Sequence, residues 1–142
     1  MSEKGEWLNG YRNGLHYIYF DNGQLIFKGY FSGTFRNGKG TEYWENGKIK
    51  EKGFYLNGKL HCATGRRYTE DGKLKEEGYF QYGNLEIGTK YFENGEYITG
   101  VFQENLNNGN CTEYWENKKK KSVGFWVEGV KNGEFSVYFN NG

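Results

Sequence analysis

Residues 41–59 read TEYWENGKIKEKGFYLNGK, and this stretch contains the pattern that recurs along the chain. The aromatic pair Tyr43-Trp44 is followed by Asn46-Gly47, and Gly53 then stands two residues before Tyr55. Asn-Gly between two runs of β-forming residues is the strongest local signal for a β-hairpin. The stretch therefore predicts two short antiparallel strands joined by a tight turn.

The pattern returns with a period of about 24 residues, which indicates a repeat protein. One column of the repeat is always tyrosine, with successive spacings of 24, 25, 23, 23 and 24 residues. Its members are Tyr19, Tyr43, Tyr68, Tyr91, Tyr114 and Tyr138. The sequence thus predicts a single domain, 1–142, of about six stacked hairpins. Their approximate boundaries are 5–28, 29–52, 53–77, 78–99, 100–123 and 124–142.

Three further columns support the hairpin interpretation. A first turn is expected at Asn22-Gly23, Asn46-Gly47, Asp71-Gly72, Asn94-Gly95 and Asn141-Gly142, whereas Asn117-Lys118 departs from the pattern. A glycine precedes an aromatic residue by two positions at Gly5, Gly29, Gly53, Gly78, Gly100 and Gly124. A second turn is predicted at Asn13-Gly14, Asn37-Gly38, Asn57-Gly58, Asn108-Gly109 and Asn132-Gly133. Looser connections are expected at Leu60–Gly65 and Gly83–Gly88.

Two types of first turn are compatible with Asn22-Gly23. A two-residue turn would pair Phe20 with Leu25, whereas a three-residue loop with a glycine bulge would pair Tyr19 with Leu25. The longer loop gives the cleaner separation of apolar and polar faces, so we predict it. It gathers on one face Tyr19, Leu25, Gly29 and Phe31, and on the opposite face of the next repeat Glu42, Lys48, Lys50 and Lys52. It also requires positive φ at Gly23, Gly47, Gly72 and Gly95, and the shorter repeat before Gly100 should be irregular.

The composition favours an all-β fold. The chain has 13 Tyr, 11 Phe, 4 Trp and 23 Gly but no Pro, and aromatic residues favour strands while glycine favours turns. A ring is expected to lie over the recurrent strand glycines. We predict an elongated, twisted antiparallel sheet, a repeat solenoid of stacked hairpins. Its array ends and edge strands would be exposed, which allows homo-oligomers to form through them.

Charge and segment composition exclude several classes of protein. The 19 basic and 18 acidic residues give a net charge of +1, so no nucleic-acid partner is expected and membrane binding is disfavoured. A run of 18 apolar residues does not occur, so no transmembrane segment is expected. The residues before Gly5 lack the apolar region of a signal peptide, which predicts a cytoplasmic location. Cys62 and Cys111 are interpreted as reduced, structural residues.

No residue pattern typical of catalysis occurs, so the chain is predicted to be a non-enzyme without a cofactor or metal. His61 and Cys62 are adjacent, and neighbours on a strand point to opposite faces, which prevents them from acting together. The carboxylates Glu42, Glu51, Glu93 and Glu113 recur with the repeat. Recurrence favours solvated strand faces over a pair for glycoside hydrolysis, because an active site is made once.

Aromatic residues beyond those needed for a core are candidates for partner binding. The residues predicted to contact a partner are Trp44, Trp115, Trp126, Tyr43, Tyr114, Lys119 and Lys120. The two lysines belong to Lys118–Lys121, which suits either a patch for anionic groups or a solvated turn. Three functions are compatible with these features: a protein-binding module such as an antitoxin or immunity protein, a carbohydrate or cell-wall binder, and a membrane-associated scaffold.

The repeated unit, from its tyrosine through Asn-Gly to the glycine and second aromatic residue, resembles the bacterial MORN-variant repeat of YwqK-type antitoxin-like proteins. Thr41–Lys59 and Arg66–Phe80 carry the match best, and it extends from Gly5 to Gly142. The resemblance implies a twisted sheet of stacked hairpins and a protein partner, commonly a toxin that is neutralised by direct binding. Departures from the pattern are Asn117-Lys118, the long Leu60–Gly65 connection and the absence of a glycine at Cys62 and Ile87.

Overall fold

A computed structural model describes residues 1–140, which form one antiparallel sheet. Its thirteen strands within these residues are β1 (Ser2–Leu8), β2 (Tyr11–Tyr19), β3 (Leu25–Ser32), β4 (Phe35–Tyr43), β5 (Ile49–Leu56), β6 (Lys59–Leu60), β7 (Cys62–Tyr68), β8 (Leu74–Gln81), β9 (Asn84–Tyr91), β10 (Tyr97–Gln103), β11 (Leu106–Tyr114), β12 (Lys120–Val127) and β13 (Val130–Val137). Residues 1–140 contain no helix of the length and hydropathy that a membrane span requires.

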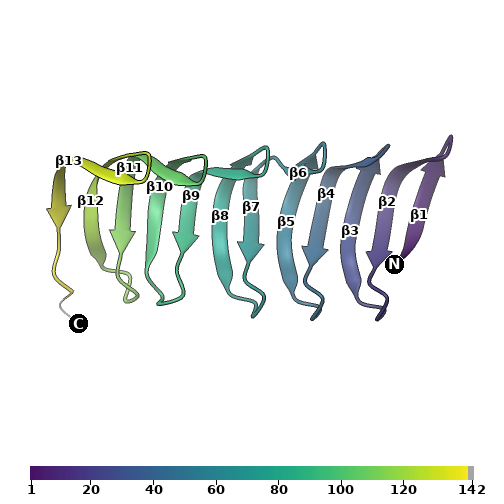
Figure 1. The fold of residues 1–142 in the computed structure, drawn as a ribbon, viewed down its shortest axis with the longest axis horizontal. Helices are drawn as coiled ribbons and strands as arrows, with labels where there is room; N and C mark the ends of the chain where they lie inside the picture. Colours follow the sequence, from purple (N-terminus) through teal and green to yellow (C-terminus); the bar gives the residue numbers. More distant parts are fainter. Residues whose placement is uncertain (141–142) are drawn as a thin grey trace.

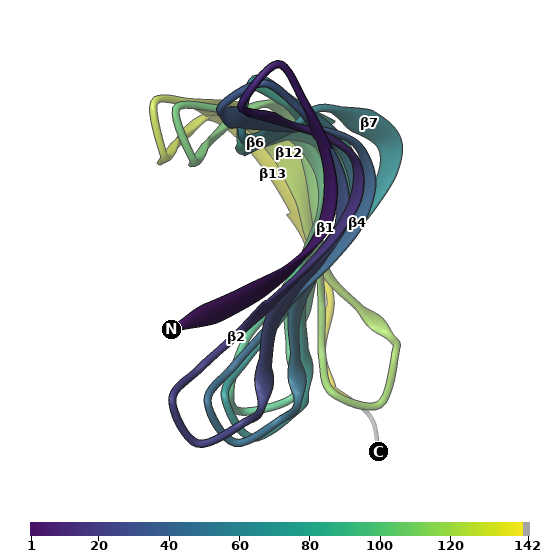
Figure 2. The same ribbon diagram turned by 90° about the vertical axis from the view of Figure 1, so that its right-hand side faces the viewer.

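The strands follow one another across the sheet in sequence order, so each hairpin pairs with the hairpins before and after it. The short β6 is the exception, because it pairs only with β5 while β7 continues the sheet. Figure 1 shows the resulting elongated row of strands. Figure 2, viewed along the row, shows the rotation between successive strands and the curling of their upper ends to one side. The predicted all-β sheet of stacked hairpins is confirmed.

The first turn of each hairpin is the predicted three-residue loop. Tyr19 pairs with Leu25, the Phe20 amide donates to the Gln24 carbonyl at 2.8 Å, and the Gly23 amide donates to the Phe20 carbonyl at 3.0 Å. Positive φ is confirmed at Gly23 (86°), Gly47 (86°), Gly72 (94°) and Gly95 (87°). Lys118 adopts the same conformation with φ of 68°, so the loop persists without its glycine. The turn predicted at Asn141-Gly142 lies outside the described residues.

The prediction of the second turn is wrong at four of its five positions. Asn13-Gly14, Asn37-Gly38, Asn108-Gly109 and Asn132-Gly133 lie inside β2, β4, β11 and β13, and only Asn57-Gly58 is a turn. The other second turns are at Asn9-Gly10, Gly33-Thr34, Tyr82-Gly83, Glu104-Asn105 and Glu128-Gly129. The strand glycines serve bulges instead: Gly29 pairs with Gly40, but Phe31 pairs with Arg36, so β4 has extra residues between them.

The predicted assignment of side chains to the two faces is also wrong, because a second bulge follows the first turn. Tyr19 pairs with Leu25, but Ile18 pairs with Phe27, which leaves Ile26 as an extra residue. Side chains alternate along a strand, so Tyr19 faces away from His16 and from its partner Gly29.

As a result, the Phe31 side chain is on the face of the sheet opposite to the tyrosine column. Glu42 shares a face with Gly40, whereas Lys52 is on the other face. We call the face that carries Tyr19, Tyr43, Tyr68, Tyr91 and Tyr114 the tyrosine face. The opposite face, which carries Phe31, Tyr55, Phe80, Phe102 and Trp126, is called the core face.

The core is a row of rings along the core face. Phe31, Tyr55, Phe80 and Phe102 are each at most 6% exposed, and the rings of Phe27 and Tyr55 meet edge to face at 5.4 Å. A Cβ added at Gly124 would lie 2.6 Å from Phe135 Cδ1, which confirms the predicted ring over glycine at this position. At Gly78 the nearest atom is instead the Ile87 carbonyl oxygen, at 2.3 Å. The glycines therefore admit either a ring or a neighbouring backbone.

The repeats of irregular length differ in their bulges. A looser connection at Leu60–Gly65 is confirmed, because the chain leaves β6 at His61 and the register of β7 shifts between Cys62 and Gly65. The same expectation for Gly83–Gly88 is wrong, since a tight turn leads directly into β9. Before Gly100, the shorter repeat lacks the bulge that follows the first turn elsewhere.

Candidate binding surface

Cationic side chains cover the rings of the core face. Distances from the cation to the ring centroid are 4.1 Å for Arg36 over Phe27, 4.8 Å for Arg67 over Phe80 and 4.7 Å for Lys90 over Phe102. Carboxylates on the same face hold them: Glu42 pairs with Arg36 at 2.7 Å, Glu51 with Arg67 at 2.8 Å, and Glu76 with Lys90 at 3.9 Å. Partly desolvated cation–π contacts are stabilising. These cations are therefore committed to contacts within the chain.

Tyr55 joins the core row to this charged layer. Its ring is buried, and its hydroxyl donates to Glu51 Oε1 at 3.0 Å. Burial raises the pKa of the Tyr55 phenol above the ordinary value of 10.0, and the adjacent Glu51 carboxylate raises the pKa further. The phenol is consequently neutral in the folded protein at pH values where a tyrosine of the unfolded chain ionises.

Tyr55→Phe is expected to make the array less sensitive to alkali. A raised folded-state pKa contributes stability that is intact below pH 10 and is lost as the pH rises toward the folded-state pKa. Between pH 10 and 11 the wild-type chain should therefore lose roughly 1 kcal/mol more free energy of unfolding than the variant. Urea unfolding across this range measures the difference, with pH 7 as the reference for the lost hydroxyl. Parallel losses in the two proteins would contradict the assignment.

The tyrosine face carries a row of exposed apolar side chains. Its members occupy the position between the strand glycine and the core ring, or pair directly with that position: Tyr30, Phe54, Tyr79, Ile87, Val101 and Phe125. They are between 37% and 57% exposed. Ile87 pairs with both Tyr79 and Val101, so the row is continuous across β8, β9 and β10. We call these six residues the apolar row.

Next to the apolar row, a second row is basic from Lys4 to Arg66, carries one carboxylate at Glu77 and has only uncharged residues beyond it. Direct register pairs connect its members across the sheet: Lys4, Tyr17, Lys28, Thr41, Lys52, Arg66, Glu77, Thr89, Thr99, Thr112, Val123 and Ser136. Beyond it runs the tyrosine column, and the ring of its member Tyr114 stacks on the neighbouring Tyr97 ring with the centroids 4.7 Å apart. The face therefore presents three parallel rows.

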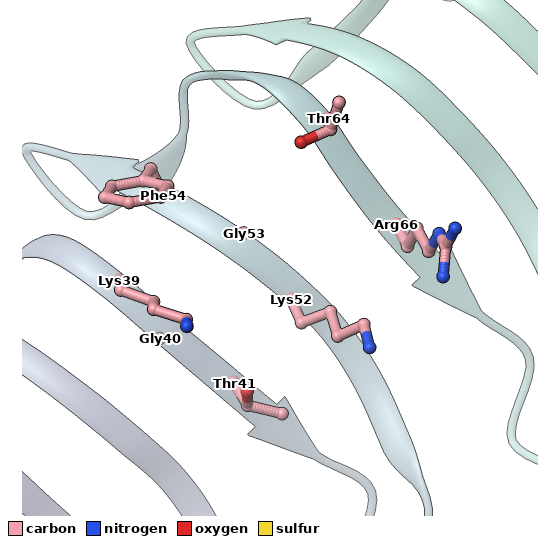
Figure 3. Close-up of a pocket in the computed structure, with 8 residues that line it drawn as sticks. All are labelled: Lys39, Gly40, Thr41, Lys52, Gly53, Phe54, Thr64 and Arg66. Carbon is pink, nitrogen blue, oxygen red and sulfur yellow. The ribbon is translucent and has the colours of Figure 1, made fainter.

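A hollow of about 340 Å³ lies on the tyrosine face where β4, β5 and β7 meet, and Figure 3 shows its lining. Lys39, Lys52 and Arg66 are its cations, and Thr41 and Thr64 contribute hydroxyl groups. Gly40 and Gly53 line it with backbone only, since a side chain at either position would point to the core face, and the ring of Phe54 lies at one end (Figure 3). We call this site the basic hollow.

The structure does not gather the sequence-predicted partner residues on one face. Tyr43 and Tyr114 belong to the tyrosine face, whereas Trp126 is half-buried in the core row with Lys131 over its ring at 5.5 Å. Trp44 and Trp115 lie half-buried beside the hairpin loops, each with a lysine over its ring. Their role in partner binding stays a prediction.

The hairpin ends also contain a hollow of about 840 Å³ between Trp44 and Phe92. It is located where Thr69 replaces the aromatic residue that follows the tyrosine in the other repeats. The lysine run lies at another hairpin end, where Lys120 pairs with Tyr114, the Lys119 amide bonds to Asn117, and Lys121 pairs with Glu96 at 2.6 Å. Lys121 is thus held within the chain.

The described residues contain no cluster of three or more His, Cys, Asp or Glu side chains that could hold a metal ion. Cys111 is buried, and desolvation raises the pKa of its thiol. The tyrosine face offers two candidate binding features: the apolar row and the basic hollow beside it.

Comparison with known families agrees with the hairpin geometry. Three segments of the chain match the MORN repeat variant. The matches cover residues 12–32, 36–57 and 63–82, which correspond to β2–β3, β4–β5 and β7–β8. MORN repeats act as protein- or membrane-binding modules. No curated protein matches the chain.

Sequence reasoning missed the apolar row and the basic hollow. Both depend on the bulge after the first turn, which moves the glycine–aromatic motif to the core face and the intervening Phe54 or Tyr79 outward. The row could have been predicted from the repeat itself, because an apolar residue stands between the glycine and the core ring in five of the six units.

Proposed function

We propose that this chain is a non-catalytic protein-binding module that receives its partner on the tyrosine face. The supporting observation is the apolar row, whose exposed side chains pair directly across β8, β9 and β10 and recur at the same repeat position on β3, β5 and β12. Contiguous exposed apolar surface marks interaction sites, and aromatic residues dominate the energetics of interfaces. The core face is a poorer candidate, because its cations already pair with carboxylates of the chain.

The charge of the neighbouring row defines the chemistry of the partner. Lys4, Lys28, Lys52 and Arg66 make this row basic beside Tyr30 and Phe54. Complementary charge speeds association and excludes partners of like charge. The partner is therefore a protein whose contact surface combines apolar groups with Asp and Glu, engaged through the N-terminal half of the array.

The finer form of this proposal is an antitoxin or immunity protein that neutralises a toxin by direct contact in the bacterial cytoplasm. Its support is the resemblance of Thr41–Lys59 and Arg66–Phe80 to YwqK-type repeats. In this form the acidic, apolar surface belongs to the toxin. Of the residues predicted from the sequence, Tyr43 and Tyr114 lie on this face, and Trp115, Lys119 and Lys120 would extend the contact at the hairpin end next to Tyr114.

Phe54→Asp is expected to weaken partner binding by at least about thirtyfold, because it places a carboxylate in the apolar row where that row runs beside Lys52 and Arg66. Phe54 is 56% exposed, so the fold should tolerate the change. Affinity capture from the native host with wild-type and variant chains, followed by titration of the captured protein, measures the effect.

Phe92→Asp is the matched control, since Phe92 is 53% exposed but lies at a hairpin end away from the row. A captured protein that binds wild type and the Phe92 variant, but not the Phe54 variant, supports the proposal. A protein that binds all three chains alike would place the interaction elsewhere and refute it.

A further inference from the structure

Two cations face each other directly in the basic hollow. Lys52 of β5 pairs in register with Arg66 of β7, and their side chains lie on the same face. Like charges at directly opposed positions destabilise a sheet. Lys39, on the neighbouring strand β4, adds a third positive charge to the same hollow. This arrangement concentrates charge at a cost to the fold.

The cations of the hollow are weakly compensated compared with those of the core face. Among the described residues, Lys39 and Lys52 form no ion pair or cation–π contact, and Arg66 has one carboxylate partner, Glu77, at 3.4 Å. On the core face, by contrast, Arg67 bonds to Glu51, to Glu76 and to the Gly83 carbonyl. The side chains of the hollow therefore retain donors for a bound group.

The shape of the hollow follows from the break in the repeat. β5 and β7 share only two register pairs, because β6 and the bulge between Cys62 and Gly65 intervene. Figure 2 shows β7 standing out from the line of the other strands. The bulge brings Thr64 to the lining, while Gly40 and Gly53 contribute backbone to it. Within residues 1–140 the site thus occurs once, at the irregular repeat.

We propose that the basic hollow binds a phosphate monoester. A phosphoryl group carries a charge of about −1.5 to −2 and three strong acceptor oxygens near neutral pH. The three cations and two threonine hydroxyls supply matching donors, and a guanidinium suits phosphate geometry. The Phe54 ring at the rim favours an organic substituent on the phosphate over the inorganic ion. The basic hollow shares Lys52, Arg66 and Phe54 with the surface proposed above for the protein partner, but phosphate binding is measured in the absence of that partner.

Phenyl phosphate is the probe, titrated into isotopically labelled wild-type chain at low salt while amide chemical shifts are followed. Shifts centred on Gly40, Gly53 and Thr64 are expected. Lys52→Met should weaken binding about tenfold and, without ligand, raise the melting temperature by about 1–2 °C because the like-charge contact disappears. Replacement of a lysine with a purely structural role would not weaken binding and raise the melting temperature at the same time.

Lys39→Met provides a second variant with weaker binding, and Lys75→Met is the control, since Lys75 is exposed and lies outside the basic hollow. Equal binding by the Lys52 and Lys75 variants, or shifts elsewhere in the wild-type chain, would overturn the proposal. Glycerol phosphate and vesicles containing phosphatidic acid then separate a soluble ligand from a lipid headgroup. Either source supports the site if binding depends on Lys52.

Discussion

Gly78→Ala is expected to lower the free energy of unfolding by about 3 kcal/mol or more. A Cβ at this position would lie 2.3 Å from the Ile87 carbonyl oxygen and 2.7 Å from Gly88 Cα. Both atoms belong to the backbone of β9, so they cannot move without disturbing the β8–β9 ladder. The φ of 140° adds a conformational cost for any residue with a side chain. Urea unfolding followed by circular dichroism measures the loss.

Gly10→Ala separates the steric effect from the conformational one. Gly10 has a φ of 81°, but nothing lies within 4 Å of the added Cβ. Its substitution should cost only about 1 kcal/mol. Similar losses for the two variants would show that close approach between β8 and β9 is not what requires the glycine.

Phe80→Ala is expected to cost about 3–5 kcal/mol, the usual range for removal of a fully buried ring. Phe80 is completely buried, it lies under the Arg67 guanidinium, and it occupies the space above Gly65. The single-layer sheet has no second layer that could fill the cavity. Chemical denaturation should therefore show a large decrease in the unfolding midpoint.

Phe54→Ala is the matched comparison, because Phe54 holds the adjacent position of another repeat but points to the tyrosine face. Its truncation should change the free energy of unfolding by less than about 1 kcal/mol. If the two truncations had equal effects, the assignment of buried and exposed faces would be wrong.

The sequence was sufficient to predict the hairpin array and the register at its first turns. The Asn-Gly signal and the separation of polar from apolar residues together select the pairing of Tyr19 with Leu25. The bulge that follows has no signature, because its extra residue is Ile26 in one repeat and Lys50 in the next. One unrecognised residue inverts the faces of every position beyond it.

The second turns were misplaced for a related reason. Gly14 and Gly38 have positive φ values of 87° and 113°, so the backbone uses their flexibility in a strand bulge instead of a turn. Glu104-Asn105 turns without any glycine. The register of β7 against β5, which pairs Lys52 with Arg66, depends on the path of the Leu60–Gly65 connection. Local sequence rules do not determine that register.

The connection between each second turn and the strand glycine that follows it differs in length from one unit to the next. This connection has five residues in Arg36–Gly40, six in Leu60–Gly65 and four in Leu85–Gly88. All three nevertheless restore glycine beside glycine and place a core ring opposite the second residue after the turn. This bulged connection therefore accommodates insertions and deletions within one unit, so that the register of the neighbouring units is preserved.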